Sequence, residues 1–419
     1  MLFFTLLELA IIVLAGRVGG ALASRFGQSP AVGEIIIGIL LGPSLFGWLS
    51  PHTFNFVFHS APPEPLLILS QLGLVLLMFQ IGLEFDFAHL AERANRAAVA
   101  RVSIACLSLP FASGLVLGYF LAPDAATPAA RINTALFVAT AFSITALPIL
   151  GRIMIDFNLT RTRLGVVAIS AAAVNDVVGW LLLALITALT VSNFVGSEFA
   201  LRVAMVGTFG LVSGKIVRPL LKRGIRLSNP RAGKMSANLL GGLLVVIFAA
   251  AMTTYQIGIF AIFGGFMMGV ILFDEPELVA AWRERVGGFV TVFFLPIFFT
   301  YTGLRTSIGG LDTVADWNWC LAIVAVASVS KFGGAYAAAR RSGFDRAESA
   351  MMGFMMNTRA LMELIVINVG FDLGVISQKM FTMLVIMAIV STVVTTPALR
   401  YYLSRGACTE PAAKPRGYA

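Results

Sequence analysis

Charged residues are scarce in this sequence. Asp, Glu, Lys and Arg make up 12% of the 419 residues, whereas hydrophobic residues make up 58%. Together with a mean hydropathy of +0.90, this composition excludes a soluble globular domain and indicates a membrane protein. An acidic residue inside a long hydrophobic run is therefore an informative exception.

Cysteine and histidine are also rare. The three cysteines, Cys106, Cys320 and Cys408, do not form the pattern of a disulfide framework. The three histidines lack metal-ligand spacing, and no Gly-rich phosphate loop follows a strand pattern. We therefore expect no cofactor and no ATP-driven transport.

Hydrophobic runs fill nearly the whole chain. A run of about 20 apolar residues can cross a bilayer as a helix, and we count about thirteen such runs. They lie near residues 4–25, 31–47, 66–87, 97–121, 132–153, 164–189, 199–219, 236–256, 258–273, 286–304, 317–340, 347–371 and 378–403. The sequence thus predicts an all-α polytopic membrane protein, with a short disordered cytoplasmic tail over residues 406–419.

The basic residues predict the orientation of the chain in the membrane. Most of the 30 Lys and Arg residues fall in loops on one side, and Arg131, Arg202, Arg305 and Lys379 lie on the other. The positive-inside rule then places the C-terminus in the cytoplasm and the N-terminus outside, across the cell (inner) membrane. The net charge of +9 is explained by this topology, so we expect no nucleic-acid partner. Arg17, within the first run, is interpreted as a side chain that extends to the interface.

The two halves of the chain resemble each other. Residues 33–42 in the second run match residues 258–269 in the ninth, and residues 79–84 in the third recur loosely as residues 300–305 in the tenth. The offsets are about 213 to 226 residues, so seven runs separate matched elements and the halves have opposite orientations. This pattern predicts two inverted repeats, a plan shared by many secondary transporters.

Polar residues interrupt the fifth and twelfth runs. Ser143, Ile144 and Thr145 precede Pro148, which lacks a backbone N–H and frees a carbonyl one turn earlier. Carbonyls at membrane depth are tolerated where they are buried or line a cavity, and they are suitable ligands for an alkali cation. Residues 357–361 form the matching break, so the sequence predicts crossed discontinuous helices. The alternative is a pair of kinked helices whose hydroxyls bond to their own carbonyls.

The sixth run contains a carboxylate near its centre. Asp176 lies in an apolar stretch in which Ala171, Ala172, Ala173 and Gly179 leave a small-residue face that another backbone can approach. A charge at that depth is costly unless a partner, water or a bound cation compensates it, so Asp176 predicts an ion or proton site. The alternative is a structural carboxylate that bonds to a neighbouring helix. Desolvation favours the neutral acid and a nearby cation favours the carboxylate, so one group can hold either ligand.

Three further charged residues lie inside the predicted spans. Lys331 or Arg359 could neutralise Asp176 when no substrate is bound, or Arg359 could pair with Glu363 at i,i+4 spacing. We therefore predict charge-compensating roles for Lys331, Arg359 and Glu363. The predicted ligands of the monovalent cation and the proton are Asp176, the Asn175 side chain, and hydroxyls or carbonyls of Ser143, Ile144 and Thr145.

Several of these motifs together resemble one family. Residues 33–43, 82–86 (Gly-Leu-Glu-Phe-Asp), 140–150, 173–177 (Ala-Val-Asn-Asp-Val) and 356–366 are similar to the monovalent cation:proton antiporters of the Kef and plant cation/H+ exchanger type. The resemblance covers nearly the whole chain. It implies an NhaA-type fold of thirteen helices and a homodimer that works by elevator-like alternating access.

The resemblance also implies a division of the membrane domain, residues 1–405. The ranges 66–189 and 286–403 would form the transport core, and the ranges 1–47 and 199–273 would form dimerisation and linker helices. Electrogenic relatives carry two adjacent aspartates in the sixth span. Asn175 replaces the first of them here, which favours electroneutral exchange.

The predicted function is the exchange of one K+ or Na+ for one proton at Asp176. Carbonyl and carboxylate ligands suit both cations, so selectivity depends on cavity geometry. Three alternatives stay open: a cation channel on the same scaffold, a Na+-selective electrogenic antiporter that uses Lys331, and a membrane-embedded enzyme. The enzyme would use Asp176 with Asp86 or Glu363 as an acid/base pair, but no nucleophile or metal cluster supports it.

Overall fold

The computed structural model describes residues 2–60, 62–83, 95–122, 127–157, 159, 162–191, 196–228, 235–359 and 361–405. Two sequence predictions lie outside these residues. They are the acid/base role considered for Asp86 and the disorder of the tail 406–419.

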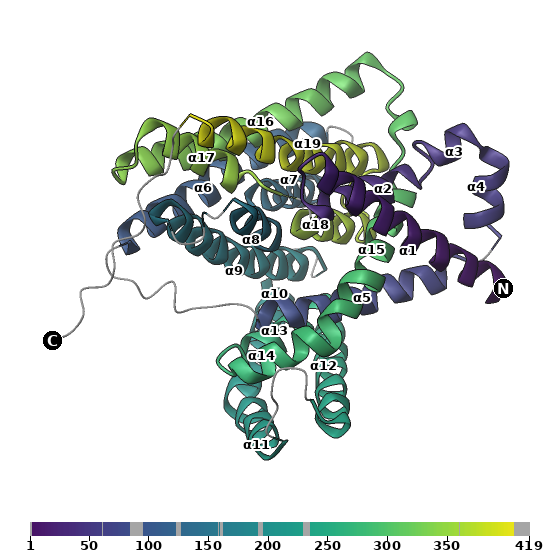
Figure 1. Ribbon diagram of the computed structural model, residues 1–419, viewed down its shortest axis with the longest axis vertical. Helices are drawn as coiled ribbons and strands as arrows, with labels where there is room; N and C mark the ends of the chain where they lie inside the picture. Colours follow the sequence, from purple (N-terminus) through teal and green to yellow (C-terminus); the bar gives the residue numbers. More distant parts are fainter. Residues whose placement is uncertain are drawn as a thin grey trace. The chain divides into compact units, whose positions relative to one another are not determined.

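Every regular element in the described ranges is a helix (Figure 1). The α-helices are α1 (Leu2–Arg25), α2 (Pro30–Leu40), α3 (Phe46–Leu49), α4 (Pro51–Phe58), α5 (Glu64–Leu83), α6 (Arg96–Leu121), α7 (Pro128–Ser143), α8 (Leu147–Asp156), α9 (Arg163–Val191), α10 (Gly196–Val212), α11 (Arg218–Ser228), α12 (Ala237–Ile257), α13 (Ala261–Val270), α14 (Pro276–Trp282), α15 (Leu295–Leu304), α16 (Val314–Arg341), α17 (Arg346–Met356), α18 (Leu361–Asp372) and α19 (Gln378–Leu403). Three short π-helices in these ranges are η2 (Ser213–Val217), η3 (Arg283–Gly287) and η4 (Val290–Phe294), and η5 (Ile308–Gly310) is a 3-10 helix.

The described part of the chain contains nine helices that are long and apolar enough to cross a membrane. The count is ten if the segments Pro276–Gly287 and Val290–Gly310, bent by 45°, form one span. Each of the thirteen predicted runs contains helix, but α2 and α13 are only 11 and 10 residues long. The all-helical, multi-pass class is confirmed, and the number thirteen stays a prediction.

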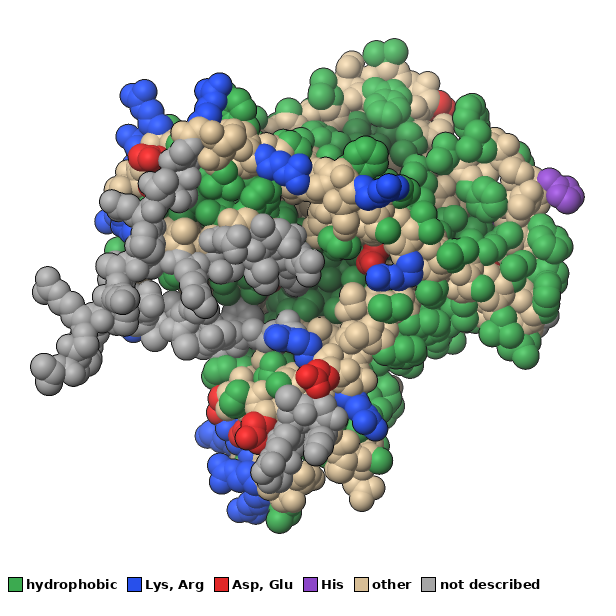
Figure 2. Space-filling model, in the orientation of Figure 1, with side chains coloured by type: hydrophobic (Ala, Val, Ile, Leu, Met, Phe, Trp, Pro, Cys, Tyr) green, Lys and Arg blue, Asp and Glu red, His purple; other side chains and the backbone are tan. Residues whose placement is uncertain are grey.

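The surface of the protein is largely apolar. Figure 2 shows hydrophobic side chains over much of the visible face, while Lys and Arg gather over α11. Leu14, Ile104, Leu181 and Val245 are exposed near the centres of long helices. Side chains of this kind are stable facing lipid, where helices satisfy their own backbone hydrogen bonds.

The helices divide into two compact units. The first contains Met1–Gly19, Glu34–Asp86 and Leu183–Thr306; the second contains Gly20–Gly33, Phe87–Leu182 and Ser307–Ala419. All the predicted site residues lie in the second unit. The predicted core ranges 66–189 and 286–403 each extend into both units, so the assignment of helices to transport and dimerisation stays a prediction.

Helices of the first unit pack closely at two sets of glycines. A Cβ atom on Gly38 in α2 would lie 2.8 Å from the carbonyl carbon of Phe299 in α15. A Cβ atom on Gly265 in α13 would lie 2.4 Å from the carbonyl oxygen of Val75 in α5. Because any side chain would clash with backbone at these distances, both crossings require glycine.

The internal repeat relates the two crossings to each other, because it matches α2 with α13 and α5 with α15. Residues 33–42, which contain Gly38, match residues 258–269, which contain Gly265, and the α5 sequence near residue 79 matches the α15 sequence near residue 300. The first-half α2 therefore packs on the second-half α15, and the second-half α13 packs on the first-half α5. This reciprocal packing is the arrangement expected for the predicted inverted repeat.

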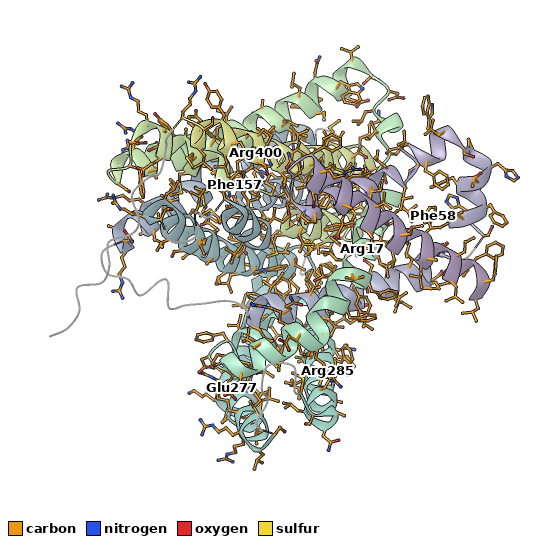
Figure 3. The ribbon with its side chains drawn as sticks, in the orientation of Figure 1. Arg17, Phe58, Phe157, Glu277, Arg285 and Arg400 are labelled. Carbon is orange, nitrogen blue, oxygen red and sulfur yellow. The ribbon has the colours of Figure 1, made fainter. Side chains whose placement is uncertain are left out.

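Several basic residues have structural partners in addition to any topological role. In the first unit, Arg17 lies 3.6 Å from the buried carboxylate of Glu34, although its own side chain is 58% exposed (Figure 3). In the second unit, Arg400 donates to the carbonyl of Gly27 at 2.9 Å, just beyond the end of α1. Arg17 thus has an acidic partner that the sequence interpretation omitted.

Candidate ion-binding site

Two helices of the second unit are interrupted. The chain leaves the helical conformation after Ser143 at the end of α7 and resumes it at Leu147, the start of α8, with Ile144 extended at φ −75° and ψ 145°. Pro148 falls in the first turn of α8, where a missing N–H has no helical partner to lose. It therefore permits a restart and does not kink a continuous helix. The second interruption separates α17 from α18.

The two interruptions cross and hydrogen-bond to each other. The backbone N–H of Ala146 donates to the carbonyl of Thr358 at 2.9 Å. The hydroxyl of Thr145 donates to the carbonyl of Met356 at 3.2 Å. Each unwound segment thus satisfies polar backbone groups of the other, which confirms the predicted crossing of the fifth and twelfth spans.

The hydroxyls of the first broken helix have different partners. Thr140 and Ser143 donate to the carbonyls one turn earlier, those of Leu136 and Ala139, both at 2.8 Å. The back-bonding that we considered as an alternative therefore occurs at these two side chains. Only Thr145 reaches the opposite helix. Each of these hydroxyl oxygens retains acceptor capacity for a cation.

Two buried cations contact the carbonyl end of α7. The guanidinium of Arg359 donates from Nη1 to the carbonyl of Ala141 at 3.1 Å, and the ammonium of Lys331 donates to the carbonyl of Ser143. Both side chains are fully buried. The C-terminal end of a helix carries partial negative charge, so cations here are favourable.

Arg359 also pairs with Glu363. The distance from Nη1 to Oε1 is 3.2 Å and both side chains are buried, so the structure contains the i,i+4 ion pair that was one of the two predicted arrangements. Nη2 donates to the carbonyl of Ala327 in α16 at 2.9 Å. One guanidinium thereby links α7, α16 and α18, and Glu363 retains one oxygen without a hydrogen-bond partner among the described residues.

Asp176 is buried in α9 without a hydrogen-bond partner. Its side chain is 1% exposed, and both carboxylate oxygens lack a partner of normal geometry within the described ranges. The nearest polar influences are the backbone N–H of Leu147, at the positive end of α8, and the charge of Lys331. A buried carboxylate is costly without a compensating ligand, so this group is suited to bind a proton or a cation.

The face of α9 that carries Asp176 is turned toward the first interruption. A Cβ atom on Gly179, three residues beyond Asp176, would lie 2.8 Å from Cγ1 of Ile144. The amide nitrogen of Asn175, which is also buried, has no partner among the described residues. The sequence predicted that another backbone could approach Gly179, but the nearest atoms belong to the side chain of Ile144.

The structure brings most of the predicted site together. Asp176 and Lys331 are electrostatically coupled, and Lys331 contacts Ser143, but no ion pair between Lys331 and Asp176 occurs in the described structure. Arg359 is occupied by Glu363 and two carbonyls and does not pair with Asp176. Whether Ser143, Ile144, Thr145 and Asn175 coordinate a cation stays a prediction.

Sequence reasoning missed the contribution of α19. Ser391, Thr392, Thr395 and Thr396 are all buried, and two of them contact the second interruption. The available signal was a cluster of four hydroxyl residues at helical spacing within the last apolar run.

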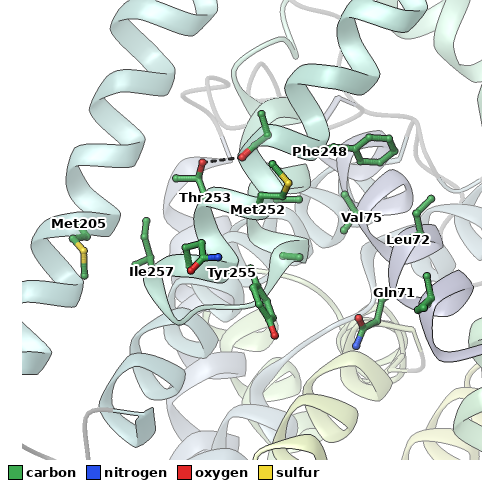
Figure 4. A pocket seen from close by; sticks show the side chains of 14 residues that line it. Gln71, Leu72, Val75, Met205, Phe248, Met252, Thr253, Tyr255 and Ile257 are labelled. Atoms are coloured by element: carbon green, nitrogen blue, oxygen red, sulfur yellow. Dashed lines mark hydrogen bonds between the residues drawn. The ribbon is translucent and has the colours of Figure 1, made fainter. Parts of the chain in front are cut away.

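A separate apolar groove of about 830 Å³ lies in the first unit, among α5, α10, α12 and the start of α13 (Figure 4). Its apolar lining residues include Leu72, Val75, Met205 and Phe248, and its polar lining residues include Gln71 and Tyr255. No acidic residue is among its lining residues, so this groove is not the predicted ion site.

Crossed broken helices beside a buried acid define a secondary transporter. The sequence matches the model of the family described as sodium/hydrogen exchanger, transmembrane, over residues 9–405, and the chain belongs to this family. The resemblance inferred from the motifs is thereby confirmed.

Individual relatives agree with this assignment. The chain is 38% identical to the Na(+)/H(+) antiporter NhaS4 of Synechocystis sp., over 94% of this chain and 96% of that protein. It is 35% identical to cation/H(+) antiporter 17 of Arabidopsis thaliana and 31% identical to K(+)/H(+) antiporter 1 of Saccharomyces cerevisiae, but it spans only 47% and 43% of their lengths. The sodium proton antiporter MjNhaP1 of Methanocaldococcus jannaschii has the same fold, with a TM-score of 0.67 over 96% of this chain at 15% identity.

Proposed function

We propose that this protein is a secondary active antiporter that exchanges one monovalent cation for one proton at Asp176 by alternating access. The proposal is carried by the buried, unpartnered carboxylate of Asp176 beside two crossed helix breaks. Membership of the exchanger family and the names of the relatives support it. The names of these relatives include both Na+ and K+, so the proposed substrate class is the alkali cation.

The charges around the break suggest how one site serves two ligands. The positive end of α8 faces Asp176, while Lys331 and Arg359 occupy the carbonyl end of α7. A cation at Asp176 would add oxygen ligands from Asn175 and the segment 143–145. A proton would neutralise the same carboxylate and remove the charge that holds the cation. Because the two ligands exclude each other, alternating access couples their movements.

Electroneutral exchange follows if Asp176 alone changes its charge. Asn175 cannot carry a second proton, so one cation replaces one proton. The candidate that competes with this proposal is an electrogenic antiporter in which Lys331 also releases its proton. It is favoured by the full burial of Lys331, whose ammonium contacts the carbonyl of Ser143 in the first interruption.

We further propose that the protein is a homodimer in the inner membrane, with its C-terminus in the cytoplasm. The family resemblance supports the dimer, and the asymmetry of Lys and Arg between loops supports the orientation.

The proposed function is tested in proteoliposomes that contain a pH-sensitive dye. We expect K+, Na+, Li+ or Rb+ added outside to discharge an imposed pH gradient, and Asp176→Asn to abolish this response while the protein stays monodisperse. Asp312→Asn is the matched control, because Asp312 is an exposed carboxylate of the same unit. Full exchange by Asp176→Asn would remove the site assignment. Cation flux that persists without a counter-gradient would instead indicate a channel.

A further inference from the structure

A row of hydroxyls in α19 faces the second interruption. The side chains of Thr392 and Thr395 are 1% exposed, although they lie within an apolar helix. A buried hydroxyl within a helix usually bonds to its own helix, and both side chains do donate in this way, to Ala388 and Ser391. They also have partners outside α19.

Thr392 and Thr395 hold the unwound segment between α17 and α18. The backbone N–H of Arg359 donates to Oγ1 of Thr392 at 3.3 Å. Oγ1 of Thr395 accepts from the hydroxyl of Thr358 at 3.3 Å. It lies 3.2 Å from the carbonyl of Phe354, an alternative acceptor to Ser391 for its single hydrogen. One face of α19 therefore holds the backbone of Arg359 and the side chain of Thr358, two consecutive residues of the interruption.

The internal repeat gives these contacts a counterpart in the first half. There α9 follows the broken pair α7 and α8, and it carries Asp176 toward the N–H of Leu147 at the start of α8. In the second half α19 follows the broken pair α17 and α18, and it carries Thr392 to the N–H of Arg359 just before α18. Beside the second interruption, the neutral hydroxyl of Thr392 thus lies where the carboxylate of Asp176 lies beside the first. The first interruption has a charged side chain that can bind a ligand, and the second is hydrogen-bonded to α19.

The fixed segment is connected directly to the carbonyl end of α7. The guanidinium of Arg359 donates to Ala141, and the carbonyl of Thr358 accepts the N–H of Ala146. A shift of residues 358 and 359 would therefore move Ala141 and Ala146, on the two sides of the first interruption. The helix of Asp176 contacts the same interruption, because Gly179 packs against Ile144.

We propose that Thr392 is a positioning residue for the ion site, acting through the backbone of Arg359, with Thr395 as a second contributor through Thr358. The inference rests on the proposed exchange function and deepens it. Thr392 does not contact the cation. Its loss weakens cation binding because the ligand segment 143–146 is no longer held in one arrangement.

The test compares valine and serine at position 392 in proteoliposome exchange, with KCl and NaCl as the added salts. Thr392→Val removes the hydroxyl and keeps the shape, so we expect the half-saturating cation concentration to rise about fivefold, the size expected for one buried hydrogen bond. Thr392→Ser keeps the hydroxyl and should stay within about twofold of the unsubstituted protein. Thr396→Val is the matched control, because this buried hydroxyl lies one turn away and has no hydrogen-bond partner among the described residues.

The half-saturating concentration distinguishes positioning from folding. If Thr392 had a purely structural role, its loss would reduce the amount of active protein and hence the maximum rate. The half-saturating cation concentration would stay unchanged. Equal constants for Thr392→Val and Thr396→Val would overturn the inference, as would a Thr392→Ser variant as impaired as the valine. If Thr392→Val does not fold, Thr395→Val decides in its place, and an unchanged constant there also overturns it. Absence of exchange by the unsubstituted protein would instead refute the proposed function, before any variant is compared.

Discussion

Arg359 makes the most extensive set of contacts among the buried charges of the second unit. Its planar guanidinium reaches Glu363, Ala141 and Ala327 from three directions at once. A lysine ammonium is a single point charge on a flexible stem and cannot span these acceptors. The residue therefore stabilises the crossing by geometry as well as by charge.

We predict that Arg359→Lys strongly destabilises the protein. Partial loss of a buried charge network leaves Glu363 poorly compensated, which costs about 3 to 5 kcal/mol when a partner is removed entirely and somewhat less for lysine. Thermal unfolding in detergent, followed by size-exclusion chromatography, measures the effect. Arg346→Lys, at an exposed position of α17, should leave the midpoint unchanged. Equal midpoints for both variants would show that the fork geometry of Arg359 is dispensable.

Residue-scale predictions from the sequence identified which buried groups matter but not their partners. Asp176, Lys331, Arg359 and Glu363 are conspicuous because ionisable side chains are rare within apolar runs. That Lys331 donates to the carbonyl of Ser143 depends on how α16 packs against α7. A single sequence does not contain that packing.

Among contacts between elements, Gly179 is the position at which α9 packs against the first helix break. A methyl group there would lie 2.8 Å from Cγ1 of Ile144, so the Ile144 side chain or the helix would have to shift. The approach of α9 to the unwound segment therefore depends on the absence of a side chain at this position.

We predict that Gly179→Ala impairs exchange and that Ile144→Ala in the same protein partly restores it. Overpacking of a close contact costs about 1 to 3 kcal/mol, and the second substitution provides the missing space. Dye-based exchange rates of the single and double variants measure the effect. Gly210→Ala is the control, since a Cβ atom there would have no neighbour within 4 Å. A double variant slower than Gly179→Ala would argue against this steric cause.

Element boundaries were predictable where the sequence contains a strong local signal. Pro148 and the hydroxyls before it indicated the first break, and the structure starts α8 one residue earlier, at Leu147. The predicted second run, residues 31–47, was too long, because α2 ends at Leu40 shortly before Gly42 and Pro43. The cluster of hydroxyls in α19 was visible in the sequence, but their partners were not, because these lie in a distant segment of the chain.

At the scale of the whole molecule, the two halves differ at the helix that follows each break. Asp176 lies beside the first break and Thr392 beside the second, which agrees with the proposal that Asp176 alone carries the proton. On that proposal, one charge moves in each direction in each cycle.

We therefore predict that an imposed membrane potential leaves the exchange rate nearly unchanged. Moving one net charge across the membrane would involve about 2.3 kcal/mol per 100 mV, enough to alter the rate substantially. Proteoliposomes with potentials set by an ionophore for a non-substrate ion measure this directly. Strong voltage dependence that disappears in Lys331→Gln would favour the electrogenic alternative.

The most direct test of the account is the half-saturating cation concentration measured as a function of pH. If the proton and the cation compete for Asp176, that concentration increases by about tenfold for each pH unit of acidification where the site is mostly protonated, while the maximum rate at saturating cation stays constant. A half-saturating concentration independent of pH, with only the maximum rate changing, would show that the two ligands do not share this carboxylate and would contradict the account.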